Sequence, residues 1–263
     1  MSKARIALQI RPEHADYADM VRVLDTAETI GVDIAYTWDH FFPLWGDTDG
    51  KHLECWTMLA AWAERTYTIL LGPLVSAIGF RNPQLLIDMA RTVDHISGGR
   101  VILGLGAGWV RRDYDDYGYE FGTAGDRLRD LSAALPIMRK RLAKLNPPPV
   151  GELPILIGGG GEKVTLRIVA EHADIWHTFG SPDVLRHKNA VLDRWCEAIG
   201  RDPHDIERST TGPAVTPDGV AAFADEFYEI GVRQFTLTLG GPEFDTAGVQ
   251  DWLDWRDAIN SSS

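Results

Sequence analysis

The sequence contains little cysteine and little positive charge. Cys55 and Cys196 are its two cysteines among 263 residues, and 26 lysine and arginine residues stand against 38 aspartate and glutamate residues, for a net charge of −12. Two distant cysteines in a chain of this size are typical of a reduced intracellular protein rather than of a secreted domain held by disulfides. Binding to nucleic acid requires a basic face that displaces counterions from phosphates, so we expect no nucleic-acid partner.

Long apolar runs and several enzyme motifs are also missing. No run approaches the roughly 20 apolar residues of a membrane-spanning helix, and Met1–Ile10 lacks the apolar core and cleavage site of a signal peptide. We therefore predict a cytoplasmic protein with no membrane partner. Because no His-Glu-x-x-His or Gly-x-Ser-x-Gly motif occurs, neither a zinc protease nor a serine hydrolase is expected. The acidic residues Asp113, Asp115 and Asp116 do not match the spacing of a calcium loop, so no metal site is predicted.

What the sequence does contain is a repeated pattern of eight short apolar runs, each followed by a segment with helical periodicity. Such alternation predicts an α/β fold, a (β/α)8 TIM barrel, in which residues 1–263 form a single domain. An open doubly wound sheet also fits, but eight units in so short a chain favour closure. The predicted strands are Arg5–Ile10, Asp33–Trp38, Ile69–Val75, Val101–Leu105, Pro154–Ile157, Asp174–Thr178, Ile206–Gly212 and Gln234–Leu239. The predicted helices are Tyr17–Ile30, Cys55–Arg65, Pro83–Ile96, Gly125–Leu142, Glu162–His172, Asp183–Ile199, Asp218–Ile230 and Asp245–Ile259.

Functional groups of such a barrel collect at the C-terminal ends of its strands, and Asp39 and His40 follow the second predicted strand. His40 can exchange a proton with a bound ligand, and Asp39 beside it can fix the tautomer of the imidazole. Alternatively, Asp39 caps a turn and the aromatic residues around it belong to the core. Aromatic loop residues favour an apolar or planar substrate, although tryptophans serve packing equally well. These residues are Phe41, Phe42, Trp45, Trp56 and Trp109.

Four consecutive glycines, Gly158, Gly159, Gly160 and Gly161, lie between the fifth predicted strand and the next predicted helix. Backbone amides without side chains at the positive end of a helix form a cradle for phosphate. The glycines therefore predict a phosphate site, with a flexible turn as the alternative. They are not a Walker loop, because no Lys-Ser or Lys-Thr follows at the required spacing.

The segment after the fourth predicted strand is similar to a dinucleotide-binding fingerprint, but Trp109 stands at the third glycine position. We interpret Gly106, Ala107 and Gly108 as backbone that passes close to a ligand, and Trp109 as a wall or lid of its site. A plain tight turn is the alternative.

Two further places concern strand ends. Gly72 and Pro73 break the rules for a barrel strand, and a bulge directed at the cavity would explain them, because bulges gather beside active sites. Trp176 and His177, in the sixth predicted strand, mark the other place. Ser181, after that strand, is suited to cap the following helix, which is a structural role.

At these residues the chain resembles the bacterial luciferase-like family of flavin and deazaflavin enzymes, and within it the deazaflavin-dependent oxidoreductases. The resemblance covers most of the first 180 residues and is most specific over Asp94–Trp109 and the glycine tetrad. It implies a barrel that binds coenzyme F-420 or FMN, with Asp39 and His40 as catalytic residues beside the ring. It also implies a bulge with a cis peptide behind the ring. The implied cofactor-binding residues are Val75, Ser76, Gly106, Ala107, Gly108, Gly158, Gly159, Gly160, Gly161 and Ser181.

The resemblance implies hydride transfer between F-420 and a small organic substrate, with His40 as proton donor or acceptor. An FMN-dependent monooxygenase served by a separate flavin reductase is the alternative on the same barrel, and a non-catalytic flavin carrier is a third. Relatives commonly carry an extra strand and loop where this chain has only Ala143–Leu153. That insertion often covers the active site. In this chain, we expect a homodimer whose second subunit is one way to cover the site instead.

Overall fold

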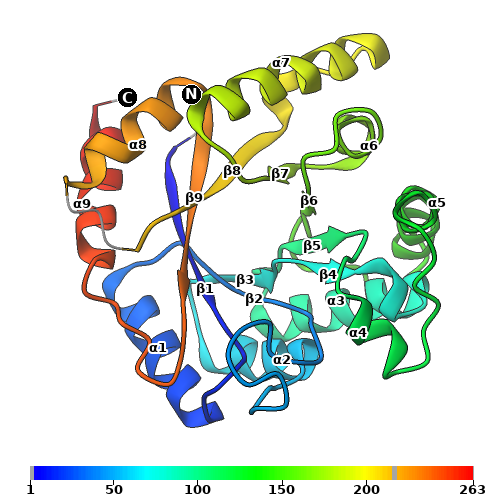
Figure 1. The fold of residues 1–263 in the computed structure, drawn as a ribbon, viewed down its shortest axis with the longest axis horizontal. Helices are drawn as coiled ribbons and strands as arrows, with labels where there is room; N and C mark the ends of the chain where they lie inside the picture. The colour runs from blue at the N-terminus through cyan, green and yellow to red at the C-terminus, as the bar shows by residue number, and fades with distance from the viewer. Residues whose placement is uncertain (1–2, 215–217, 263) are drawn as a thin grey trace.

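The strands of the computed structural model form one parallel sheet that curls into a barrel (Figure 1). The structure describes residues 3–214 and 218–262. Their strands are β1 (Arg5–Ile10), β2 (Ile34–Thr37), β3 (Leu70–Pro73), β4 (Ser76–Ala77), β5 (Leu103–Gly106), β6 (Ile155–Gly158), β7 (Ile175–His177), β8 (Glu207–Gly212) and β9 (Val232–Leu239). The order in the sheet is β3-β2-β1-β9-β8-β7-β6-β5-β4. A parallel bridge between Leu71 in β3 and Val101, just before β5, links the two ends of this order, so the barrel is nearly closed.

Helices lie outside the ring of strands (Figure 1). They are α1 (Tyr17–Ile30), α2 (Cys55–Arg65), α3 (Pro83–Ser97), α4 (Arg111–Asp115), α5 (Ala124–Leu142), α6 (Thr165–His172), α7 (Pro182–Ile199), α8 (Val220–Glu229) and α9 (Val249–Ser261), with short 3-10 helices η1 (Ile78–Phe80) and η2 (Pro203–Asp205). Asn260 joins α9 to the chain before β1, because its side chain accepts a hydrogen bond from the Ala4 amide at 2.8 Å and donates one to the Ala4 carbonyl at 3.0 Å.

The predicted barrel of alternating strands and helices is confirmed, with three local differences. The third strand is divided into β3 and β4 by a cis peptide bond between Leu74 and Val75, directly after Gly72 and Pro73, which pair regularly in β3 although the bulge was predicted from them. Helix α4 was not predicted, because five residues are too few to show helical periodicity. Helix α6 begins at Thr165 rather than at Glu162, since the three residues after the glycines form a turn.

Helix α3 shows how the sequence defines an element. Asn82 precedes it and accepts a hydrogen bond from the Gln84 amide at 2.9 Å, and Pro83 occupies the first helical position, where no amide hydrogen is needed. The helix ends at Gly98, whose φ of 71° is left-handed and favours glycine. Between these signals, Leu86, Ile87, Ala90 and Val93 are buried on the face toward the barrel.

The core has three clusters, of which the smallest consists of Ala77, Phe80 and Tyr114. The largest packs the outer faces of the strands against the helices. A smaller cluster lies among the strands and consists of Ala7, Ile34, Tyr36, Leu74, Ile102, Leu156 and Ile175. On β8 and β9 the buried side chains Ser209, Thr210 and Gln234 are polar instead, and each takes part in a side-chain hydrogen bond. Buried polar groups need hydrogen-bond partners, so this side of the barrel contains a network rather than simple apolar packing.

Neither cysteine forms a disulfide, and both are buried. Within the described ranges, no helix combines the length and the apolar character needed to cross a membrane.

Candidate active site

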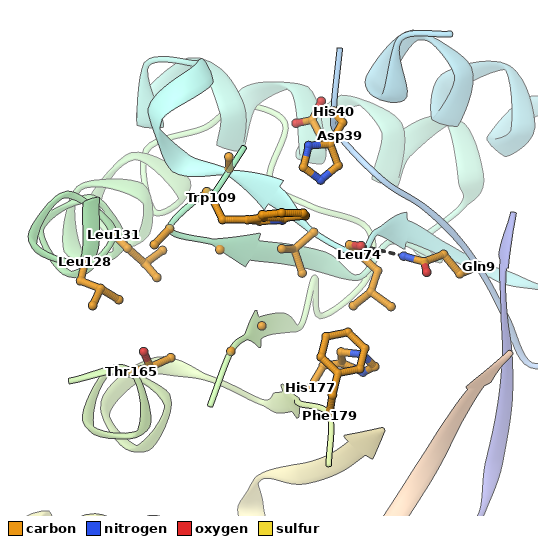
Figure 2. Close-up of a pocket in the computed structure, with 17 residues that line it drawn as sticks. Gln9, Asp39, His40, Leu74, Trp109, Leu128, Leu131, Thr165, His177 and Phe179 are labelled. Carbon is orange, nitrogen blue, oxygen red and sulfur yellow. Dashed lines mark hydrogen bonds between the residues drawn. The ribbon is translucent and has the colours of Figure 1, made fainter. Parts of the chain in front are cut away.

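A cavity of about 340 Å³ opens at the C-terminal ends of the strands (Figure 2). Its size falls within the usual range of small-molecule sites. The predicted site residues that line it are Asp39, His40, Val75, Gly106, Ala107, Gly108, Gly158 and Gly159. The predicted residues Ser76, Gly160, Gly161 and Ser181 are not among its lining. The lining also includes Gln9, Leu74, Ala77, Leu128, Leu131, Thr165 and Phe179, which were not proposed as site residues, and His177, from one of the strand ends singled out in the sequence.

His40 is held by a carboxylate 73 residues further along the chain. Its Nδ1 lies 2.6 Å from Oδ2 of Asp113 in α4, and the other oxygen of Asp113 accepts the Phe41 amide hydrogen at 2.9 Å. Asp113 is fully buried. Because an ionised carboxylate accepts hydrogen bonds and donates none, Nδ1 carries a proton, and Nε2 of the neutral ring is left as an acceptor. Figure 2 shows the His40 ring directed into the cavity.

Asp39 belongs to a different pair. Its two oxygens accept hydrogen bonds from Nη1 and Nη2 of Arg81 at 2.5 and 3.0 Å, and Nη2 of Arg81 also contacts Glu54 at 2.7 Å. Burial raises the pKa of Asp39, and the positive charge of Arg81 opposes that shift. The bidentate geometry uses both oxygens as acceptors, which is the ionised form. The prediction that Asp39 fixes the tautomer of His40 is therefore wrong, since Asp113 makes that contact.

The bulge between β3 and β4 forms one wall of the cavity. Nε2 of Gln9 donates a hydrogen bond to the Leu74 carbonyl at 2.9 Å, and Thr238 donates one to Oε1 of Gln9 at 3.2 Å. A Cβ at Gly106 would lie 2.7 Å from Cγ2 of Val75. Glycine at 106 therefore lets the bulge pack directly on β5, which is a packing reason for this residue beside its predicted role at the ligand.

The loop after β5 forms the neighbouring wall, because β5 pairs with β4. Gly108 has a left-handed φ of 81°, and a Cβ there would overlap the hydroxyl of Tyr114. This hydroxyl donates a hydrogen bond to the Ala107 carbonyl at 3.3 Å, which ties the loop to α4. Trp109 is 67% exposed, and its ring stands nearly perpendicular to that of His40 at 5.9 Å. Trp109 is thus a wall of the cavity, as predicted.

The glycine tetrad connects β6 to the start of α6. Gly159 adopts φ 127°, and its carbonyl accepts a hydrogen bond from the Trp176 indole at 2.8 Å. The first turn of α6 has no side-chain cap, so its amides are suited to bind an anion. Nζ of Lys188 in α7 lies 2.5 Å from the Gly160 carbonyl and adds a positive charge beside the tetrad. The sequence reasoning missed Lys188, which lies in the next helix.

His177 lies at the end of β7 and is the second imidazole of the cavity. Its Nδ1 lies 2.8 Å from the hydroxyl of Ser209, and burial lowers its pKa to about 4. The neighbouring Phe179 is 69% exposed, and its ring meets that of His177 edge-on at 5.2 Å. Figure 2 shows His40 and His177 on opposite sides of the cavity, with Leu74 between them.

Most of the aromatic residues that suggested a planar substrate have other positions. Among Phe41, Phe42, Trp45, Trp56 and Trp109, the cavity lining includes Trp109 alone. The indole of Trp56 is buried and donates to the Ser76 hydroxyl at 3.0 Å, and Phe41 stacks on Tyr117. Ser181 caps α7 by accepting the Val184 amide hydrogen at 3.4 Å, as its structural interpretation predicted.

The short connection before β6 lies at the end of the barrel opposite the cavity. It runs from the end of α5 to the start of β6, so it is at the N-terminal ends of the strands, whereas the cavity is at their C-terminal ends. Asp94 anchors it by accepting the amide hydrogens of Val150 and Gly151 at 2.7 and 3.1 Å. In this chain the connection itself therefore does not border the cavity, and cover by a second subunit stays a prediction.

Within the described part of the chain, His, Cys, Asp and Glu side chains form no group of three or more that could hold a metal ion. The groups that the cavity offers to a ligand include two imidazoles, the backbone of its glycine-rich loops and apolar walls.

Comparisons with known proteins agree with this geometry. A Mycobacterium tuberculosis protein, provisionally named a coenzyme F-420-dependent oxidoreductase, is 30% identical over 246 residues, which cover 82% of this chain and 66% of that protein. The chain spans about half to two thirds of the length of the first curated relatives it matches.

Two solved structures share the fold. An F-420-dependent secondary alcohol dehydrogenase in complex with an F-420–acetone adduct has a TM-score of 0.81 at 17% identity, over 95% of this chain and 99% of that one. A type II Baeyer-Villiger monooxygenase from Pseudomonas putida, in complex with FMN, has a TM-score of 0.61 at 16% identity, over 79% and 67% of the two chains. A family model described as luciferase-like monooxygenase matches residues 1–259. The chain therefore belongs to the luciferase-like monooxygenase family.

Proposed function

We propose that the chain is a coenzyme F-420-dependent oxidoreductase that transfers hydride between the deazaflavin and a small organic substrate. The observation that carries the proposal is the pairing of His40 with the buried carboxylate of Asp113 at a cavity of ligand size. An imidazole held in one tautomer beside such a cavity is suited to proton exchange with a substrate. The names of the relatives support the choice of F-420.

The residues of the site fit such a cofactor. The bulge at Leu74 and Val75 offers an apolar wall against which a planar ring can pack, and Gly106, Ala107 and Gly108 border the same space. The uncapped start of α6, the glycine tetrad and the ammonium group of Lys188 would hold a phosphate of the cofactor tail. The hydroxyl of Ser181 is engaged as a helix cap, so a cofactor-binding role for Ser181 stays a prediction.

F-420, when bound, would supply the hydride chemistry, and the chain would supply orientation and a proton site. In the oxidation of an alcohol, Nε2 of His40 would take the hydroxyl proton while the carbon gives up its hydride. In the reduction of a carbonyl compound, the same nitrogen would return a proton to the oxygen. Asp113 would stabilise the imidazolium that forms, because its buried carboxylate lies 2.6 Å from Nδ1. Trp109 would limit the access of water from the mouth of the cavity.

An FMN-dependent monooxygenase is the second candidate. The description of the family model and the FMN in a structure of the same fold favour it. This function would require a separate flavin reductase as a partner. A homodimer and a cytoplasmic location stay predictions under either function.

Titration of the purified protein with F-420 and, separately, with FMN tests the proposal. Trp109 lies in the cavity wall, so quenching of tryptophan fluorescence should report binding, and Trp109→Phe is the control that identifies the responding residue. We expect micromolar affinity for F-420 and weaker affinity for FMN. Preference for FMN would instead favour the monooxygenase, and binding of neither cofactor would refute both functions.

A further inference from the structure

A chain of hydrogen bonds runs through the polar side of the barrel and ends at His177. It begins at Oε1 of Gln234, which lies 3.4 Å from Nη2 of Arg5 and 3.4 Å from the hydroxyl of Tyr36. A guanidinium group has hydrogen-bond donors only, and burial raises the pKa of Tyr36, so its hydroxyl keeps its hydrogen. Both neighbours therefore turn the oxygen of the Gln234 amide toward themselves and direct its NH2 group away.

The next link fixes the direction of the remaining bonds. Nε2 of Gln234 donates to the hydroxyl oxygen of Ser209 at 2.9 Å. The single hydrogen of Ser209 is then available for Nδ1 of His177, 2.8 Å away. Because burial keeps the imidazole neutral, with a pKa of about 4, a ring that accepts at Nδ1 carries its proton on Nε2.

Among the described residues, the hydrogen on Nε2 of His177 meets no close acceptor. The hydroxyl of Thr211 lies 3.5 Å from this nitrogen, which is the outer limit of a hydrogen bond. His177 is 3% exposed but lines the cavity together with Leu74 and Val75. A flat ring that packs against the bulge would therefore bring one of its edges to this imidazole.

We propose that His177 donates a hydrogen bond from Nε2 to a carbonyl oxygen of the flavin-type ring, and that Ser209 and Gln234 are positioning residues that set its tautomer. The inference rests on the cofactor class of the proposed function. F-420 and FMN both carry carbonyl oxygens at the pyrimidine end of the ring, and such oxygens accept hydrogen bonds. His177 would offer this end an N–H, whereas His40 offers a substrate its lone pair.

The tautomer can be read without any cofactor. In protein labelled with 15N-histidine, the long-range 1H–15N spectrum of the ring should show His177 protonated at Nε2. Ser209→Ala removes the donor to Nδ1 and should produce a mixture of tautomers, while Ser209→Thr, which keeps the hydroxyl, should restore the wild-type pattern. Thr211→Val is the control and should leave the pattern unchanged. Protonation of the wild type at Nδ1 would overturn the inference.

Cofactor affinity tests the contact itself. His177→Phe removes the donor at similar size and should weaken binding of both F-420 and FMN about tenfold, the usual scale of one hydrogen bond. His177→Gln keeps a side-chain N–H and should recover most of the affinity. Thermal unfolding of each variant shows whether it is folded under the assay conditions.

The outcomes separate this inference from the proposed function. A wild type that binds a cofactor, together with a folded His177→Phe or Ser209→Ala variant of equal affinity, would overturn the inference and leave the function standing. A wild type that binds neither F-420 nor FMN would overturn both.

Discussion

The two histidines of the cavity have opposite hydrogen-bond polarity. His40 contacts the carboxylate of Asp113, which can only accept, so its Nε2 faces the cavity as an acceptor. His177 contacts the hydroxyl of Ser209, whose oxygen already accepts from Gln234, so its Nε2 carries a hydrogen. The same side chain is thus prepared for proton transfer on one side of the cavity and for hydrogen-bond donation on the other. The difference comes from the second residue in each pair.

Asp39→Asn should have the largest effect. This effect should be a loss of stability rather than a change in the chemistry of His40. The change leaves the guanidinium group of Arg81, whose side chain is 11% exposed, without its main counter-charge. Removing one partner of such a buried pair costs about 3–5 kcal/mol of unfolding free energy. Urea denaturation of the wild type and the variant measures this difference in the free energy of unfolding. The exposed pair of Asp25 and Arg65 provides the control, since Asp25→Asn should cost at most about 1 kcal/mol. A stable Asp39→Asn protein with altered His40 chemistry would return Asp39 to the role first predicted for it.

His40→Ala should reduce turnover by at least about 100-fold, the usual scale for an acid–base residue, while the affinity for the cofactor stays within a few-fold. The measurements are the rate of hydride transfer and the fluorescence titration. His204→Ala, at a side chain that is 92% exposed, is the matched control and should leave both values unchanged. Unchanged turnover of His40→Ala would remove His40 from the mechanism.

Asp113→Asn should lower turnover by about 10- to 100-fold, because it reverses the polarity of His40. The amide hydrogen of Phe41 needs an acceptor, so the oxygen of the substituted carboxamide would face Phe41 and its NH2 group would face Nδ1 of His40. His40 would then carry its proton on Nε2, as His177 does. The 1H–15N spectrum of the ring checks the change of tautomer, and a variant with normal turnover and the reversed tautomer would contradict our account of His40.

The fold was predictable because it depends on local patterns, whereas the pairs of the site depend on distant residues. Alternation of strands and helices placed Asp39, His40 and the glycine tetrad at the correct end of the barrel. Asp113 could not be assigned to His40 from sequence, because it lies on the unpredicted helix α4.

His177 was singled out with Trp176 as a candidate place but could not be given a role from the sequence, for a related reason. A strand of three residues shows too little alternation to reveal which side chains face the interior. Its partners Ser209 and Gln234 lie on β8 and β9, and only closure of the barrel brings them together. Residues whose role depends on closure can be identified from the structure but carry no local signal.

Acid should destabilise the protein through His177. Its pKa is about 4 in the folded protein and about 6.5 in the unfolded chain, so between these values the unfolded state binds the additional proton. The free energy of unfolding should therefore fall by about 2 kcal/mol from pH 7 to pH 5 on account of this group. His177→Gln should remove that part of the pH dependence in urea denaturation. His52, whose pKa burial also lowers to about 4, contributes equally in both proteins and cancels in the comparison. An equal pH dependence of the free energy of unfolding in wild type and His177→Gln would mean that the fold does not hold His177 neutral. The contrast with His40 would then fail.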